Sequence, residues 1–113
     1  MKLAIVGSRT FNDYELLTSE LADLANSVSE VVSGGSKGAD LLAEKWAMSQ
    51  SIPLKIFKAN WERYGRSAGP QRNREIVDYS DHCVAFWDGK SKGTLYTINL
   101  FKKHNKPVKI VRI

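Results

Sequence analysis

Short apolar runs rich in β-branched residues alternate along the chain with stretches whose apolar residues recur at helical spacing. Tyr14, Leu17, Leu21 and Leu24 have this spacing, which predicts a helix over residues 13–26. Gly65 and Gly69 mark an irregular segment at residues 60–69. The apolar runs predict five strands, at residues 2–6, 28–32, 54–59, 82–87 and 107–113. Three more helices are predicted at residues 39–51, 70–79 and 93–103.

This alternation of strands and helices predicts a parallel sheet, because parallel neighbours need a crossover that a helix supplies. Crossovers of this kind are right-handed. The expected fold is therefore α/β, a Rossmann-like three-layer sandwich with a five-stranded parallel sheet and helices on both faces. With 113 residues, 42% of them hydrophobic and 26% charged, the chain is expected to form one globular domain, residues 1–113.

Several classes of protein are not supported by the sequence. No apolar run approaches the roughly 20 residues of a membrane helix, and residues 1–7 are too short an apolar stretch for a signal peptide. Cys83 is the only cysteine, which excludes an internal disulfide, and neither His82 nor His104 has a partner at metal-ligand spacing. We expect a cytoplasmic protein with no membrane partner, no metal and no cofactor.

Positive charge is concentrated in two segments of a chain whose net charge is +5. Residues 55–74 hold six cations against Glu62 and include Trp61 and Tyr64, and residues 90–113 hold seven cations and no acid. Cations mixed with aromatic side chains suit a ligand that carries phosphates and bases. The alternative is a solvated basic face with Trp61 in the core.

Ligands of open parallel sheets bind beyond the carboxyl ends of the strands. Gly34, Gly35 and Gly38 follow the second strand, and glycines let backbone N–H groups come close to a ligand. The next helix adds the positive end of its dipole, and Lys37 adds a charge. The alternative is a tight turn that needs glycine and binds nothing. Polar turns follow three strands: Gly7-Ser8-Arg9, Ser33-Gly34-Gly35-Ser36-Lys37-Gly38-Ala39-Asp40 and Trp87-Asp88-Gly89-Lys90-Ser91-Lys92-Gly93-Thr94.

Common nucleotide motifs do not match these turns. A P-loop ending at Gly89-Lys90-Ser91 would need glycine at Val84, and a dinucleotide-binding motif starting at Gly34 would need glycine at Ser36 and Ala39. The sequence therefore supports neither an ordinary NTPase nor an ordinary dehydrogenase. Asp88 could hold a ribose hydroxyl or a cation, or could cap its own turn.

Four motifs in order resemble one family: Gly7-Ser8-Arg9-x-Phe11-x-Asp13, Ser33-Gly34-Gly35-x-x-Gly38-Ala39-Asp40, Ala68-Gly69-Pro70-x-Arg72-Asn73 and Phe86-Trp87-Asp88-Gly89-x-Ser91-x-Gly93-Thr94. Together they are similar to the YspA-like, cpYpsA-related branch of the SLOG superfamily, from about Lys2 to Pro107. The resemblance implies a Rossmann-like fold and a site for nucleotides or nucleotide-derived ligands. More distant similarity extends to Lonely Guy phosphoribohydrolases and DprA-type proteins.

One departure favours binding over catalysis. The last motif of the Lonely Guy enzymes resembles P-G-G-x-G-T-x-x-E, and its glutamate falls on Thr97 here. Arg72 can stand for their arginine, but a threonine hydroxyl is no general base near neutral pH. Asp40 or Asp88 could supply a carboxylate, although neither occupies the matching position. No catalytic residue is therefore assigned.

The expected function is binding of a small nucleotide or nucleotide-derived ligand, of the ADP-ribose, NAD or nucleoside phosphate type, by a sensor or sequestering module. The alternatives are a nucleotide N-glycosidase or phosphoribohydrolase and a nucleic-acid-binding protein. Arg9 and Arg72 would pair with phosphate oxygens, and Trp61 or Trp87 would stack on a base or ribose. A homodimer is expected, since pairing would cover an exposed helix face. The candidate ligand-binding residues are Gly7, Ser8, Arg9, Ser33, Gly34, Gly35, Lys37, Gly38, Ala39, Asp40, Trp61, Arg72, Asn73, Trp87, Asp88, Gly89, Ser91, Gly93 and Thr94.

Overall fold

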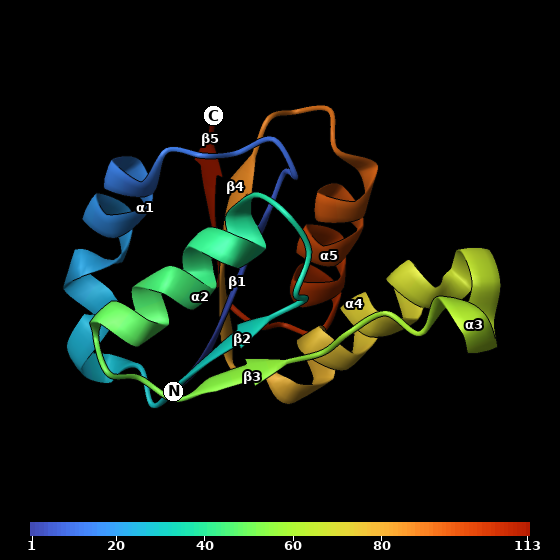
Figure 1. The fold of residues 1–113 in the computed structure, drawn as a ribbon, viewed down its shortest axis with the longest axis horizontal. Coiled ribbons are helices and arrows are strands. Elements are labelled where there is room, and N and C mark those ends of the chain that lie inside the picture. Colours follow the sequence, from blue (N-terminus) through green and yellow to red (C-terminus); the bar gives the residue numbers. More distant parts are fainter.

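A computed structural model describes residues 1–113 as a central parallel sheet between two layers of helices (Figure 1). The sheet has the strand order β3-β2-β1-β4-β5, and every neighbouring pair is parallel. The strands are β1 (Lys2–Gly7), β2 (Glu30–Ser33), β3 (Leu54–Ile56), β4 (His82–Trp87) and β5 (Val108–Arg112). The helices are α1 (Tyr14–Leu21), α2 (Ala39–Ser49), α3 (Trp61–Tyr64), α4 (Ala68–Tyr79) and α5 (Lys92–Lys103), with 3₁₀ segments η1 (Ala22–Ser27) and η2 (Gly65–Ser67). The predicted Rossmann-like α/β class is confirmed.

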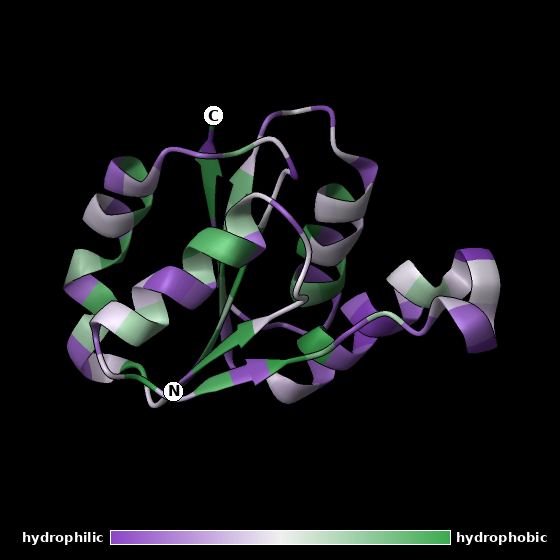
Figure 2. Cartoon of the chain, viewed as in Figure 1, coloured by the Kyte–Doolittle hydropathy of each residue, from purple (hydrophilic) through white to green (hydrophobic).

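Alternate residues of the central strands supply two cores, one on each face of the sheet. Leu3 and Ile5 of β1 pack in the core that α1 and α2 cover, whereas Ala4 and Val6 pack in the core that α4 and α5 cover. All four are buried, as expected for a strand enclosed on both faces. Figure 2 shows hydrophobic colour along these strands and more hydrophilic colour on the outlying α3. The burial pattern explains why helices are needed on both faces.

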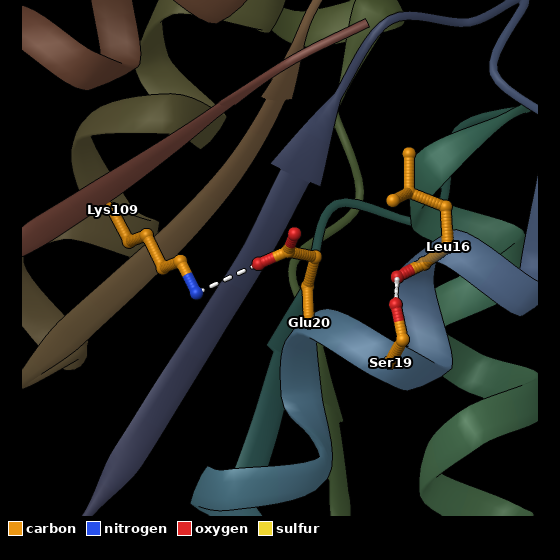
Figure 3. Close-up of polar contacts among 4 residues, drawn as sticks. All are labelled: Leu16, Ser19, Glu20 and Lys109. Atoms are coloured by element: carbon orange, nitrogen blue, oxygen red, sulfur yellow. Dashed lines mark hydrogen bonds and ion pairs between the residues drawn. The ribbon is translucent and has the colours of Figure 1, made fainter.

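The edge strand β5 is tied to the first helix by an ion pair. The Lys109 Nζ nitrogen lies 2.7 Å from Glu20 Oε2 on α1 (Figure 3). The same view shows the Ser19 hydroxyl donating a 2.9 Å hydrogen bond to the Leu16 carbonyl oxygen within α1. Because the Lys109 side chain is 52% exposed, this pair contributes about 0–1 kcal/mol to stability.

The prediction of an irregular segment at residues 60–69 is wrong, because most of these residues are helical. The Asn60 side chain accepts a hydrogen bond from the Arg63 N–H and so begins the four-residue helix α3. Gly65, with φ +55°, follows the end of this helix, and α4 begins at Ala68 rather than Pro70. Pro70 still lies in the first turn of α4, where its missing N–H has no intrahelical acceptor.

Other element boundaries also differ from the sequence prediction. The α-helix predicted to reach residue 26 ends at Leu21 and continues as the 3₁₀ segment η1, and β3 ends at Ile56 rather than 59. Helix ends depend on caps and local packing more than on apolar spacing.

None of the helices combines the length and apolar character needed to span a membrane.

The topology places several turns at one end of the sheet. The chain leaves β1 for β2 on one side, and β4 later returns to pair with β1 on the other side. The order of strands therefore reverses around β1, which is the position where open α/β sheets have their ligand crevice. The segment with α3 protrudes from the body of the molecule beside this end (Figure 1).

Candidate functional site

Two adjacent cavities lie at the carboxyl ends of the central strands. The smaller one, of about 100 Å³, is formed by residues of β1, α4 and α5 together with the turns after β1 and β2. The larger one is a groove of about 650 Å³ that runs toward α3. Both cavities are bordered by Arg9, Gly34, Ser36 and Arg72. The small cavity is further lined by Val6, Gly7, Asp40, Asn73, Ile76, Ser91, Gly93, Thr94 and Thr97.

Gly38 allows the turn after β1 and the turn after β2 to approach each other closely. Its φ of +74° and ψ of −125° belong to a backbone region that residues with a side chain rarely adopt. A Cβ atom at Gly38 would lie 2.4 Å from the Ser8 carbonyl oxygen and 2.5 Å from the Arg9 carbonyl oxygen. The next residue, Ala39, donates its N–H to the Ser8 carbonyl oxygen at 3.3 Å. Glycine at this position therefore sets the distance between the turn after β1 and the start of α2.

Arg72 is held between α4 and the turn after β2. Its side chain is 9% exposed, and Nη1 donates a 2.7 Å hydrogen bond to the Gly34 carbonyl oxygen. Nε donates to Asn73 Oδ1 at 2.8 Å, and Nη1 makes a longer contact of 3.4 Å with the Ser36 hydroxyl. Burial lowers the pKa of Arg72, and the nearby Asp40 charge opposes that change. Nη2 makes no hydrogen bond within the protein, so Arg72, which lines both cavities, keeps a donor for a ligand.

Asp40 is the only carboxylate that lines either cavity. It lies in the first turn of α2, is 8% exposed, and accepts a 3.1 Å hydrogen bond at Oδ2 from the Ser36 N–H. Burial raises the pKa of Asp40, and the neighbouring Glu44 adds to this, whereas the Ser36 N–H and the Arg72 charge lower it. A buried carboxyl group of this kind can accept hydrogen bonds, but its ionised form is costly because burial removes it from water.

The turn between β4 and α5 forms the opposite wall of the small cavity. Asp88 Oδ1 accepts hydrogen bonds from the Ser91 and Lys90 N–H groups, each at 2.8 Å, and these bonds lower the pKa of Asp88. The Ser91 hydroxyl in turn accepts from the Thr94 N–H at 3.3 Å, capping α5. A Cβ atom at Gly93 would meet nothing within 4 Å. The first turn of α5 therefore faces open space.

The larger groove carries only positive charge. Its charged lining residues are Arg9, Lys37, Lys58 and Arg72, with no acid among them. Trp61 also lines it and is 54% exposed, so the interpretation of Trp61 as a core residue is wrong. Four cations in a concave surface attract anions over a distance, and an exposed indole offers a face for stacking.

The structure brings most of the candidate residues together. The candidate residues fall into two groups, those that border a cavity and those that do not. Twelve border a cavity: Gly7, Arg9, Gly34, Gly35, Lys37, Asp40, Trp61, Arg72, Asn73, Ser91, Gly93 and Thr94. Seven border neither: Ser8, Ser33, Gly38, Ala39, Trp87, Asp88 and Gly89.

Trp87 lies apart from both cavities. Its indole N–H donates a 3.1 Å hydrogen bond to the Ser91 carbonyl oxygen, and the Arg112 guanidinium carbon lies 5.6 Å from its ring centroid. Of the two tryptophans expected to stack on a ligand, only Trp61 borders a cavity.

Sequence reasoning missed six lining residues, which are Val6, Ser36, Lys58, Ala59, Ile76 and Thr97. Two of them could have been found from helical spacing. Ile76 follows Arg72 by four residues on α4, and Thr97 follows Gly93 by four residues on α5. Ser36 and Lys58 lie within the glycine-rich turn and the basic segment that were already singled out.

Fold and cavities together define a Rossmann-like α/β protein with glycine-rich turns around two cavities at the carboxyl edge of its sheet. The model of the YspA, cpYpsA-related SLOG family matches residues 1–64, more than half of the chain, and the chain belongs to this family. It is also 34% identical over 116 aligned residues to the Gene 61 protein of Mycobacterium phage D29, covering 95% of this chain and 93% of that protein.

Solved structures of DNA processing protein A share the fold. The protein from Streptococcus pneumoniae superimposes with a TM-score of 0.80 at 19% identity, over 96% of this chain and 49% of that one. The protein from Helicobacter pylori, whose structure describes a single-stranded DNA binding mode, gives a TM-score of 0.73 at 24% identity, over 97% of this chain and 64% of that one. The chain thus spans about half to two thirds of these two proteins.

Proposed function

We propose that this chain binds a nucleotide or nucleotide-derived ligand through its phosphate groups, in the two adjacent cavities. The observation that carries the proposal is the position of Arg72. Its guanidinium is oriented by hydrogen bonds to Gly34 and Asn73, Nη2 has no partner within the protein, and the residue lines both cavities. An arginine fixed in this way recognises phosphate oxygens with little loss of side-chain entropy on binding.

The surroundings of Arg72 support a ligand with both phosphate and base. Arg9, Lys37 and Lys58 add positive charge along the groove, and Trp61 lies in the same groove for a base to stack on. The groove volume of about 650 Å³ lies within the range of about 300–1,000 Å³ that is usual for small-molecule sites. Nucleotide-related binding also fits the SLOG family to which the chain belongs.

The role that we propose is that of a cytoplasmic sensor or sequestering module rather than a hydrolase. At Thr97, where phosphoribohydrolases of the superfamily carry a glutamate, the hydroxyl donates a 3.1 Å hydrogen bond to the Gly93 carbonyl oxygen. This hydroxyl is bonded within its own helix, and a threonine offers no carboxylate to a reacting sugar.

A second candidate is binding of single-stranded nucleic acid. The basic groove does not end at the sheet but reaches Lys58 and Trp61, next to the protruding α3 segment with its cations Arg63 and Arg66. Groove cations and an exposed aromatic are the usual features of a single-strand binding surface. The fold shared with DNA processing protein A is consistent with this candidate.

Isothermal titration calorimetry tests both candidates on one panel: ADP-ribose, NAD, AMP, cyclic AMP and a short thymidine oligonucleotide. We expect Arg72→Lys to weaken binding of the best ligand by about 10-fold or more, since a hydrogen bond to a charged group contributes about 1.5–3 kcal/mol. Arg74→Lys is the matched control, because Arg74 lies on the same helix, is exposed, and makes only a 3.4 Å contact with the Tyr96 hydroxyl.

The results separate the candidates. Micromolar binding of a mononucleotide with weak salt dependence supports the small ligand, whereas preference for the oligonucleotide with a steep loss at higher salt supports nucleic acid. No heat with any member of the panel, for protein shown to be folded by circular dichroism, would contradict the proposed function.

A further inference from the structure

The small cavity presents charges of both signs that do not neutralise each other by contact. Arg9, Arg72 and Asp40 all line it, yet no Arg72 or Arg9 nitrogen lies within 4.0 Å of an Asp40 oxygen. The one ion pair in the structure joins Lys109 and Glu20. Both groups lie beside Gly34, where the absence of a side chain makes room for them, since a Cβ built there would lie 2.8 Å from Arg72 Nη1 and 2.9 Å from Asp40 Oδ2. Cation and carboxylate are therefore both available to one ligand.

Asp40 has an acceptor to spare in this cavity. Oδ2 accepts the Ser36 N–H, and the nearby Ser36 hydroxyl also favours the ionised carboxylate, whereas no backbone N–H or other side chain donates to Oδ1. Since 8% of Asp40 is exposed and the residue borders the cavity, a ligand can reach this carboxylate. Any anion that enters must either bring a hydrogen for Asp40 or meet its negative charge at close range.

A phosphate monoester can bring that hydrogen. Its second ionisation has a pKa of about 6, so near neutral pH a monoester readily carries one O–H while keeping a negative charge. A phosphodiester and a sulfate ion have no such O–H and would face the carboxylate without a hydrogen bond. We propose that the small cavity takes a terminal phosphomonoester and that Asp40 is the residue that selects it, by accepting a P–O–H hydrogen bond while Arg72 and Arg9 hold the other oxygens.

The shape of the site agrees with a terminal group. The small cavity measures about 100 Å³ against about 650 Å³ for the adjacent groove, and residues of β1, α4 and α5 line it. A group at the end of a ligand fits there, and the nucleoside is left in the groove beside Trp61. This inference rests on the proposed function, because it assigns the phosphate end of the same ligand.

Matched ligands test the selection directly. Calorimetry compares AMP with adenosine 5′-O-methylphosphate, which keeps the base, the sugar and one negative charge but has no P–O–H. We expect AMP to bind at least about 10-fold more tightly, the ratio for one hydrogen bond to a charged group. In competition for bound AMP, inorganic phosphate should displace it at concentrations where sulfate does not.

Two variants complete the test. Asp40→Asn should tighten binding of the methyl ester and reduce the preference for AMP to less than about 3-fold, because an amide does not repel a diester and can donate to it. Asp78→Asn makes the same change on an exposed residue that borders neither cavity and should keep the wild-type preference. Gly93→Ala adds a methyl group where nothing lies within 4 Å, so it should fold normally and weaken AMP binding.

The outcomes distinguish this inference from the proposed function. Equal affinity for AMP and its methyl ester, or an Asp40→Asn variant with unchanged preference, would overturn the inference and leave nucleotide binding standing. Absence of binding by AMP, the ester and the other nucleotides would overturn both.

Discussion

The Arg72 Nη1 nitrogen donates a 2.7 Å hydrogen bond to the carbonyl oxygen of Gly34, across 38 residues of sequence. This bond joins α4, on one face of the sheet, to the turn after β2, which leads to α2 on the other face. The guanidinium consequently links the two helical layers at the edge where the cavities lie. Changes at either residue should affect folding and binding together.

Replacing Gly34 by alanine tests this link. The new methyl group would lie 2.8 Å from Arg72 Nη1 and 2.9 Å from Asp40 Oδ2, so both side chains must shift. Overpacking of this kind costs about 1–3 kcal/mol in the free energy of unfolding, measurable by urea denaturation. Gly69→Ala is the control, because its methyl group would meet only the Trp61 ring, at an ordinary 3.6 Å. A Gly34→Ala variant as stable as wild type would contradict the described packing.

Gly38 and Gly65 separate backbone strain from lack of space. Their angles are nearly equal, with φ +74° and ψ −125° at Gly38 and φ +55° and ψ −130° at Gly65. A methyl group at Gly65 meets nothing within 4 Å, so Gly65→Ala should cost only the strain, about 1–3 kcal/mol. At Gly38 the methyl group would meet the carbonyl oxygens of Ser8 and Arg9 at 2.4 and 2.5 Å.

We therefore expect Gly38→Ala to be clearly the less stable variant in thermal unfolding followed by circular dichroism. Equal melting temperatures for the two variants would mean that the contact between the first two turns is looser than described.

The carboxyl group of Asp40 should make stability depend on pH. Burial raises its pKa above 3.8, and the facing charges are Arg72 on α4, Arg9 after β1 and Glu44 on α2. The folded state then binds more protons than the unfolded state between 3.8 and the raised value, so this group lowers stability as pH rises through that window. Asp40→Asn should have a higher Tm than wild type at pH 7–8, with the difference closing near pH 3.

Thermal scans of the unliganded protein at several pH values give this comparison. A difference in Tm that stays constant from pH 3 to pH 8 would show that titration of Asp40 is not its cause.

Trp61 should matter for binding and little for folding. Because it is 54% exposed, Trp61→Ala should change the free energy of unfolding by less than about 0.5 kcal/mol. Loss of a stacked base costs about 1–3 kcal/mol in binding, so affinity for AMP or an oligonucleotide should fall by about 5-fold or more. Met48→Ala, at a residue 78% exposed on α2 and outside both cavities, is the control that should change neither property.

The sheet and the meeting of its turns could be predicted from sequence because both follow from general rules. An apolar run closed by Gly7 locates β1, a second apolar run locates β4, and parallel strands necessarily gather their carboxyl ends. The short helix α3 was missed because it depends on one side chain, Asn60, that caps it between stretches rich in glycine and charge. No apolar repeat reveals a helix of four residues.

The position of Trp87 shows a different limit. It shares the β4 face of Cys83 and Ala85, on the side of α5, and is turned toward Arg112 of β5. Alternation along the strand indicates the face but not the distance from the cavities, which depends on the local path of the Asp88–Ser91 turn. The homodimer and the single domain at residues 1–113 stay predictions.

Arg72 borders both hollows of the site, so the two are one electrostatic unit. A negative group seated in either hollow reduces the positive potential that remains for the other, and thermodynamic linkage makes this influence mutual. Two separate anions would therefore compete even without touching, whereas a single molecule long enough to enter both would offset part of that penalty, because its second group binds intramolecularly.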